Sequence, residues 1–184
     1  MQCFAVDGIS GTSMADIVRA SGLSSGAIYS HFESKAELLR HVMSTMLEER
    51  FTAVAAEPDG SATTVTPEAL LARLLAGPSA NRAQTSVLVQ VWGEMSRDED
   101  LVLVAEENVA HLRSLLVQTL MPWALQRADA DQVGGLTTRT AEWLIAVTFG
   151  FATVLALQSA GEQPDFQVNL LAAARAIGDH DHRS

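Results

Sequence analysis

The sequence predicts an all-α protein with a small helix-turn-helix head and a larger helical body. Apolar residues recur at helical spacing along most of the 184 residues, and the alternating pattern of strands is nearly absent. A loop rich in Pro, Gly, Ser and Thr, EPDGSATTVTP at 57–67, follows the first helices. We assign residues 1–46 to the head and residues 47–184 to the body.

The head begins with two short helices joined by a tight turn. Ser13 followed by Asp16 predicts a capping box for the first of them, which should stop at Ser21-Gly22. Ser24 predicts the cap of the second, in which Ile28 and Phe32 share one face. Leu23, in the turn, is expected to join the same small core.

A longer helix should then connect the head to the body. Ser34 with Glu37 predicts a second capping box, and the apolar pattern continues to about Ala56. In the body, helices are expected at 67–76 (ended by Gly77-Pro78), across Val87 to Met95, at 101–127 with a kink at Pro122, at 137–160 after a turn at Gly134-Gly135, and at 166–177. The tail GDHDHRS should be mobile.

Composition limits the classes of function. A net charge of −10 argues against broad, nonspecific binding of nucleic acid, because neutralising phosphates requires a basic face. A small DNA-reading head is still compatible with it, although residues 1–57 carry four Lys or Arg against seven Asp or Glu. Cys3 is the single cysteine, so neither a disulfide within the chain nor a cysteine metal site is expected.

The same composition predicts a cytoplasmic protein. No signal peptide is visible in MQCFAVDGIS, and the most apolar window, 143–157, is interpreted as too short to span a bilayer.

The second short helix has the residues that a DNA-reading helix needs. With Ile28 and Phe32 in the core, the outward residues are Ser25, Gly26, Ala27, Tyr29 and Ser30. Small side chains let the backbone approach base edges, and Tyr29 offers a hydroxyl and a ring. His31 and Lys35, the only lysine in the chain, can meet flanking phosphates. The alternative is an ordinary helix corner with a solvated lysine.

The stretch GTSMADIVRASGLSSGAIYSHFESKAELL, residues 11–39, closely resembles the DNA-binding head of the TetR family of bacterial transcriptional repressors. The resemblance implies base-edge contacts from Ser25, Gly26, Ala27 and Tyr29. It implies phosphate contacts from Ser13, Ser30, His31 and Lys35. Compared with the family, only the end of the first helix is present, in CFAVDG, and we expect the natural start to lie upstream.

The body resembles the family's ligand-binding and dimerisation domain by layout. A small-molecule pocket is expected to include Trp92, Met95, Asn108, His111 and Trp123, although aromatic and Met residues at helical spacing also suit an ordinary core. The helix at 137–160 is apolar nearly all round, which predicts that a second copy covers it. The expected dimer interface contains Trp143, Val147, Phe149, Phe151, Val154, Leu170 and Leu171. A monomeric bundle with this helix at its centre is the alternative.

No pattern predicts catalysis, a cofactor or a metal. No Ser-His-acid order or phosphate-cradling glycine loop is evident, and the HDH of the tail suits a solvated end better than a metal site. The sequence therefore predicts a ligand-responsive transcriptional regulator, most simply a repressor, that binds a palindromic operator as a homodimer. The alternative is a dimeric helical module that binds a small molecule or a protein and whose head does not engage DNA.

Overall fold

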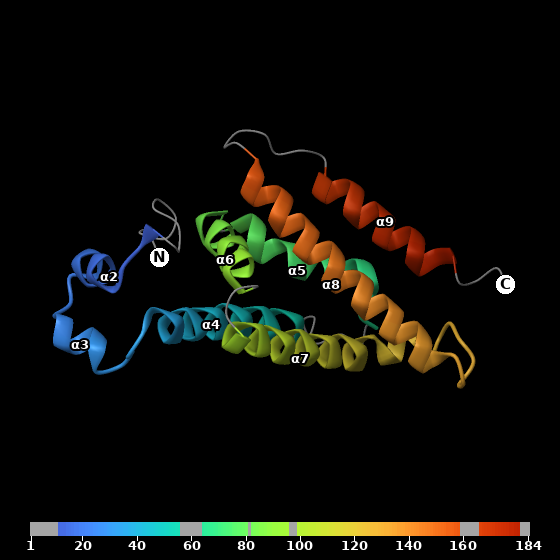
Figure 1. Ribbon diagram of the computed structural model, residues 1–184. Coiled ribbons are helices and arrows are strands. Elements are labelled where there is room, and N and C mark those ends of the chain that lie inside the picture. The colour runs from blue at the N-terminus through green and yellow to red at the C-terminus, as the bar shows by residue number, and fades with distance from the viewer. Residues whose placement is uncertain (1–10, 56–63, 81, 96–98, 159–165, 181–184) are drawn as a thin grey trace.

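The computed structural model describes residues 11–55, 64–80, 82–95, 99–158 and 166–180, and within these ranges every regular element is a helix. Figure 1 shows α2 and α3 at one end of an elongated molecule, joined by α4 to a body of packed helices. The predicted all-α class is confirmed. The helices are α2 (Met14–Ser21), α3 (Ser25–Tyr29), α4 (Lys35–Ala55), α5 (Pro67–Ala80), α6 (Arg82–Met95), α7 (Glu99–Ala124), α8 (Val133–Leu157) and α9 (Phe166–His180).

Capping fixes the helices of the head, as predicted. The Ser13 hydroxyl accepts the backbone N–H of Asp16 at 3.2 Å, and the Asp16 carboxylate accepts the backbone N–H of Ser13 at 2.9 Å. Gly22 ends α2 with a φ of 70°, a left-handed conformation that suits glycine. The Ser24 hydroxyl caps α3 by accepting the N–H of Ala27 at 3.2 Å.

The start of α4 differs slightly from the predicted capping box. The Ser34 hydroxyl accepts the N–H of Glu37 at 3.1 Å, as expected. The Glu37 carboxylate, however, accepts the N–H of Glu33 at 2.7 Å rather than that of Ser34. The side chain therefore reaches one residue further back and ties the α3–α4 connection to the first turn of α4.

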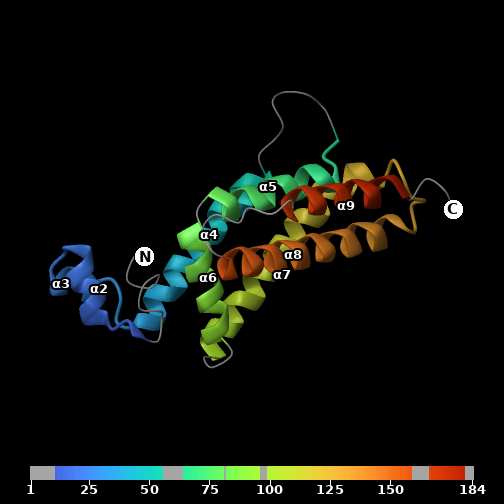
Figure 2. The ribbon, with the colours of Figure 1, turned by 90° about the horizontal axis from the view of Figure 1, so that it is seen from above.

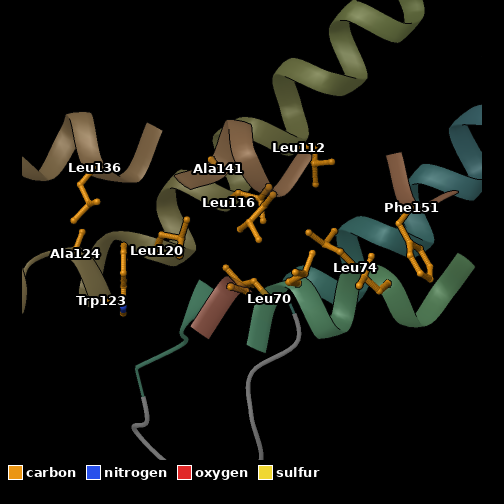
Figure 3. Packing of buried hydrophobic residues seen from close by; sticks show 14 of the residues in the cluster. Leu70, Leu74, Leu112, Leu116, Leu120, Trp123, Ala124, Leu136, Ala141 and Phe151 are labelled. Atoms are coloured by element: carbon orange, nitrogen blue, oxygen red, sulfur yellow. The ribbon is translucent and has the colours of Figure 1, made fainter. Parts of the chain in front are cut away.

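The body is built on a leucine-rich core. Figure 3 shows side chains of α5, α7 and α8 converging, among them Leu70, Leu116, Leu120 and Ala141, all without solvent exposure. α9 adds the buried Ala174. Figure 2 shows α9 beside α5 and α8, with α4 continuing from the head toward the body.

α8 packs against α5, α6 and α7. Its buried threonines return their hydroxyl hydrogen bonds to their own helix, for example Thr140 to the carbonyl of Leu136 at 2.8 Å and Thr148 to that of Leu144 at 2.7 Å. In the described residues, α8 is the one helix long and apolar enough to cross a membrane by length and composition. Because α8 begins at Val133, it is longer than the apolar window 143–157, and its length alone does not exclude a membrane span. Packing within the chain buries 33% of its most apolar stretch.

Three local predictions are wrong. α5 continues through Gly77 and Pro78 to Ala80, and Gly134-Gly135 lies in the first turn of α8, so these weak helix formers end neither helix. The turn before α8 instead lies at 125–132. Leu23 is 59% exposed and does not join the small core of the head.

Several other expectations concern ends of elements. α8 ends at Leu157, and residues 159–165 lie outside the described ranges. α9 extends to His180, so the predicted tail begins within a helix and only 181–184 lie outside the description. The predicted first-helix remnant in residues 3–8 also lies outside the described residues. The boundary predicted between residues 46 and 47 falls within α4.

Candidate DNA-reading helix and ligand cavity

The outward face of α3 consists of small residues and one tyrosine. Ser25, Gly26, Ala27 and Ser30 are exposed, and the Tyr29 side chain is 49% exposed. Ile28 is the one buried residue of the helix, at 7% exposure. A helix of this kind offers its backbone and a single aromatic side chain to a groove.

Gly26 is not required by the fold. A methyl group added at its Cα would meet no atom within 4 Å. The backbone of Gly26 is not left-handed. Among the described glycines, only Gly22 has a positive φ. The fold therefore leaves room for a side chain at this position, and a glycine here keeps the backbone of α3 accessible.

Hydrogen bonds within the head use two of the predicted phosphate-binding hydroxyls. The Ser13 hydroxyl donates to the Asp16 carboxylate at 2.5 Å in addition to capping α2. This bond, the Ser13 backbone N–H and the nearby Arg19 lower the pKa of Asp16. The Ser30 hydroxyl donates to the carbonyl of Ala27 at 2.9 Å. Each of these oxygens keeps acceptor capacity, but the proton that a phosphate would accept is engaged.

Lys35 ties two parts of the head together. Its Nζ donates to the carbonyl oxygen of Thr12 at 3.1 Å, and Thr12 is almost fully buried. The ammonium thus links the first residue of α4 to the chain just before α2. His31, four residues before Lys35, is exposed.

The body contains a cavity of about 750 Å³, within the range of sites for drug-sized molecules. It is lined from α6, α7 and α8, with Leu74 added from α5. The ring of Trp92 on α6 stacks on that of Phe149 on α8, with centroids 4.4 Å apart and planes at 18°. The full lining is Leu74, Leu88, Trp92, Val102, Ala105, Glu106, Asn108, Val109, Ala110, Leu112, Arg113, Glu142, Ile145, Ala146, Thr148 and Phe149.

Two of the five residues predicted for the pocket line this cavity, namely Trp92 and Asn108. His111 is exposed and does not belong to the lining. Trp123 is fully buried in the leucine-rich core, with the Arg127 guanidinium 5.3 Å above its ring, and is not part of the lining either. The side chain of Met95 lies outside the described residues.

The predicted dimer residues divide between core and surface. Phe151 is 6% exposed and stacks on Phe166 of α9 within the same chain, at 6.0 Å between centroids. Phe149 lines the cavity. Val154 is exposed on α8, whereas the others are partly buried against the core: Trp143, Val147, Leu170 and Leu171. Helical spacing could not separate these groups, because both faces of α8 are apolar.

A small cluster, here called the junction cluster, connects head and body. It contains the buried Leu39 of α4 with Val87 and Val91 of α6, and Ile17 of α2 and Leu38 of α4 pack against it. Leu88 and Trp92, the next residues along α6, line the cavity. α6 therefore contacts the head with one side and the cavity with the other.

Comparison with known proteins gives one family and two related folds. Residues 1–42 match the sequence model of a family described as bacterial regulatory proteins, tetR family. GusR of Salmonella enterica has a similar structure, with a TM-score of 0.74 and 24% identity over 96% of this chain and 89% of that one. SCO3833 of Streptomyces coelicolor A3, a member of the TetR transcriptional regulator family, gives a TM-score of 0.53 and 22% identity over 100% of this chain and 88% of that one. Curated protein sequences give no significant match.

The fold is an N-terminal helix-turn-helix head on a helical body, and the two solved structures share it. The resemblance predicted for the head is confirmed, since residues 1–42 match the model of the tetR family. At the identities found, the two solved structures support the fold alone.

Proposed function

We propose that the protein is a ligand-responsive repressor that binds a palindromic operator as a homodimer. In each head, Ser25, Gly26, Ala27 and Tyr29 would meet base edges in the major groove, and His31 and Lys35 would hold the flanking phosphates. Ser13 and Ser30 would join them by turning their hydroxyl protons from Asp16 and from the carbonyl of Ala27 to the phosphate. Two heads would reach successive major grooves if their α3 helices lie about 34 to 36 Å apart. A ligand in the body would favour a different spacing.

The observation that carries this proposal is the division of α6 between the junction cluster and the cavity. A ligand that displaces Leu88 or Trp92 would move or rotate α6 as a whole. A closely packed interior cannot be compressed locally, so the displacement of one side chain is passed on to its helix. Val87 and Val91 then move against Leu39 of α4. Such a ligand has different affinities for the two head positions, which is the thermodynamic requirement for coupling.

Homodimer formation is proposed through the exposed apolar surface of α8 and α9. Leu157 is 80% exposed and Val154 is 36% exposed on α8, and Val168 on α9 is 65% exposed. A second copy that covers these side chains removes apolar surface from water. Because Phe149 and Phe151 pack within the chain, a glutamate at Leu157, rather than at either phenylalanine, is the clean test. We expect Leu157→Glu to sediment as a folded monomer and Gln158→Glu, its neighbour, to stay dimeric.

The experiment for DNA binding is an anisotropy titration with duplexes selected from random sequence. The protein is expected to enrich a palindrome, with an affinity that falls as salt rises. Gly26→Val should abolish binding without loss of helical signal, since the fold leaves space at this position. Gly93→Val, also in a helix and with no atom near an added Cβ, is the matched control. Failure to enrich any sequence, with an extended N-terminus included, would instead support a helical ligand-binding module that does not engage DNA.

A further inference from the structure

The lining of the cavity offers few hydrogen bonds to a ligand. Most of the lining residues are apolar, and most of the polar ones are already engaged. The hydroxyl of Thr148 donates to the carbonyl of Leu144 at 2.7 Å. Arg113 pairs with Glu142, and Asn108 has an interaction within the chain, which leaves Glu106. A molecule rich in hydroxyl groups would lose its bonds to water on entering and find few replacements. The cavity therefore suits a ligand that is mainly apolar.

The stacked rings of Trp92 and Phe149 favour a flat ligand. Both side chains line the cavity and both are half-buried, so part of each ring remains uncovered. Aromatic rings pack best in offset stacks or edge to face. A planar aromatic group can extend the existing stack or meet its edge without requiring either ring to turn.

The cavity is lined by two carboxylates and one guanidinium, so one carboxylate has no cation to balance it. Arg113 Nη1 of α7 lies 3.6 Å from Glu142 Oε1 of α8, and both side chains are about half exposed at the cavity. Glu106 of α7 also lines the cavity, and no described side chain forms an ion pair or hydrogen bond with it. The three charged groups sum to −1, in a chain whose net charge is −10. Both the local and the overall field favour a cation.

We propose that the cavity binds a planar aromatic molecule with one positive charge, the ring against Trp92 and Phe149 and the cation near Glu106. This inference rests on the proposed ligand response, and it adds the chemical class of the ligand. An anion would have to compete with Glu142 for Arg113 and would enter against the field of the whole protein. The uncovered aromatic faces add attraction for the cation.

Three probes of similar size test the class of ligand. They are 2-naphthylmethyl-trimethylammonium, 2-naphthylmethanol and 2-naphthylacetate, each titrated into the full chain by calorimetry. The cation should bind about fivefold more tightly than the alcohol, with the carboxylate weakest, since exposed charge and cation–π contacts contribute about 1 kcal/mol. Tightest binding by the carboxylate, or no binding of any probe at millimolar concentration, would overturn the proposal.

Two variants separate the contact from the overall field. Glu106→Gln should reduce the preference for the cation over the alcohol to about twofold or less. Glu107→Gln removes the same charge from the next residue of α7, which is exposed and does not line the cavity, and should leave the preference unchanged. Equal effects of both variants would contradict a role for Glu106. Trp92→Ala should weaken both the cation and the alcohol, and the cation more, because the ring contributes stacking to both and a cation–π contact to the cation alone.

The outcome is distinguishable from that of the proposed function. If the cation binds as expected but operator affinity does not change, the ligand class stands and the ligand response fails. If the operator is bound and no aromatic cation is accepted, the regulator stands and the ligand class fails.

Discussion

Head and body are stabilised by different means. The body buries leucines from several helices, with Leu70, Leu116 and Leu120 fully buried. In the head, α2 has no buried residue and α3 has one, Ile28, so hydrogen bonds from Ser13, Ser24 and Lys35 define its geometry. The junction cluster adds apolar packing between this head and the body, and under the proposed function it is the contact through which the body would influence where α3 lies.

The largest expected effect is in the body core. Leu116→Ala should lower the free energy of unfolding by about 2 to 5 kcal/mol, because it removes a fully buried side chain and leaves a cavity. Leu103→Ala, on the same helix with 58% exposure, should change it by less than about 0.5 kcal/mol. Urea denaturation followed by circular dichroism measures both. Equal costs would contradict the packing of α7.

A smaller and more local effect is expected from Ile28→Ala. The head should lose about 2 kcal/mol, and operator binding with it, while the body keeps its stability. All three tryptophans lie in the body, so tryptophan fluorescence reports the unfolding of the body alone. A melting temperature that falls by several degrees in the fluorescence signal would show that head and body unfold as one unit, against the contrast drawn between them.

Lys35→Met tests whether the ammonium serves the fold, the DNA or both. Loss of the bond to Thr12 should destabilise the head by about 1 kcal/mol. If Lys35 also contacts a phosphate, the affinity for DNA should fall about equally on all DNA sequences. The slope of log affinity against log salt concentration should then decrease by roughly one per head. A loss of affinity with an unchanged slope would assign the lysine to the fold alone.

The smallest effect concerns the contact between α5 and α9. Arg175 donates to both carboxylate oxygens of Glu68, at 3.0 and 2.6 Å, and these bonds lower the pKa of Glu68 below its usual 4.5. A lowered pKa means that the contact stabilises the fold above about pH 4.5 and that the gain disappears as the pH falls through the lowered value. Glu68→Gln should therefore be less stable than the parent at pH 7, and the difference should disappear as the pH falls through the lowered pKa of Glu68. A difference that persists in acid would indicate another cause.

Features with a local cause could be predicted from the sequence. The caps at Ser13 and Ser24 and the glycine turn at Gly22 follow from side chains next to the backbone groups they satisfy. Pro78 and Gly134 were misread as helix breaks, because a weak helix former need not end a helix.

The sequence places Trp92 and Asn108 in a pocket and Phe149 in a dimer interface, and in the structure all three line the cavity. Helical periodicity gives the face on which a residue lies, but it does not give what that face contacts. Arg113, Glu106 and Glu142 carry no sequence signal of their own, because charged residues on helices are mostly solvated.

The central claim is that α6 couples the cavity to the head, and operator affinity of Trp92→Ala tests it most directly. Trp92 lies in the body and stacks on Phe149, so its removal should free α6 and weaken operator binding about tenfold, within the usual range of allosteric coupling. Val89→Ala, on the same helix but in neither the cavity lining nor the junction cluster, should bind within twofold of the parent. If Trp92→Ala binds the operator as tightly as Val89→Ala, α6 does not connect the two sites.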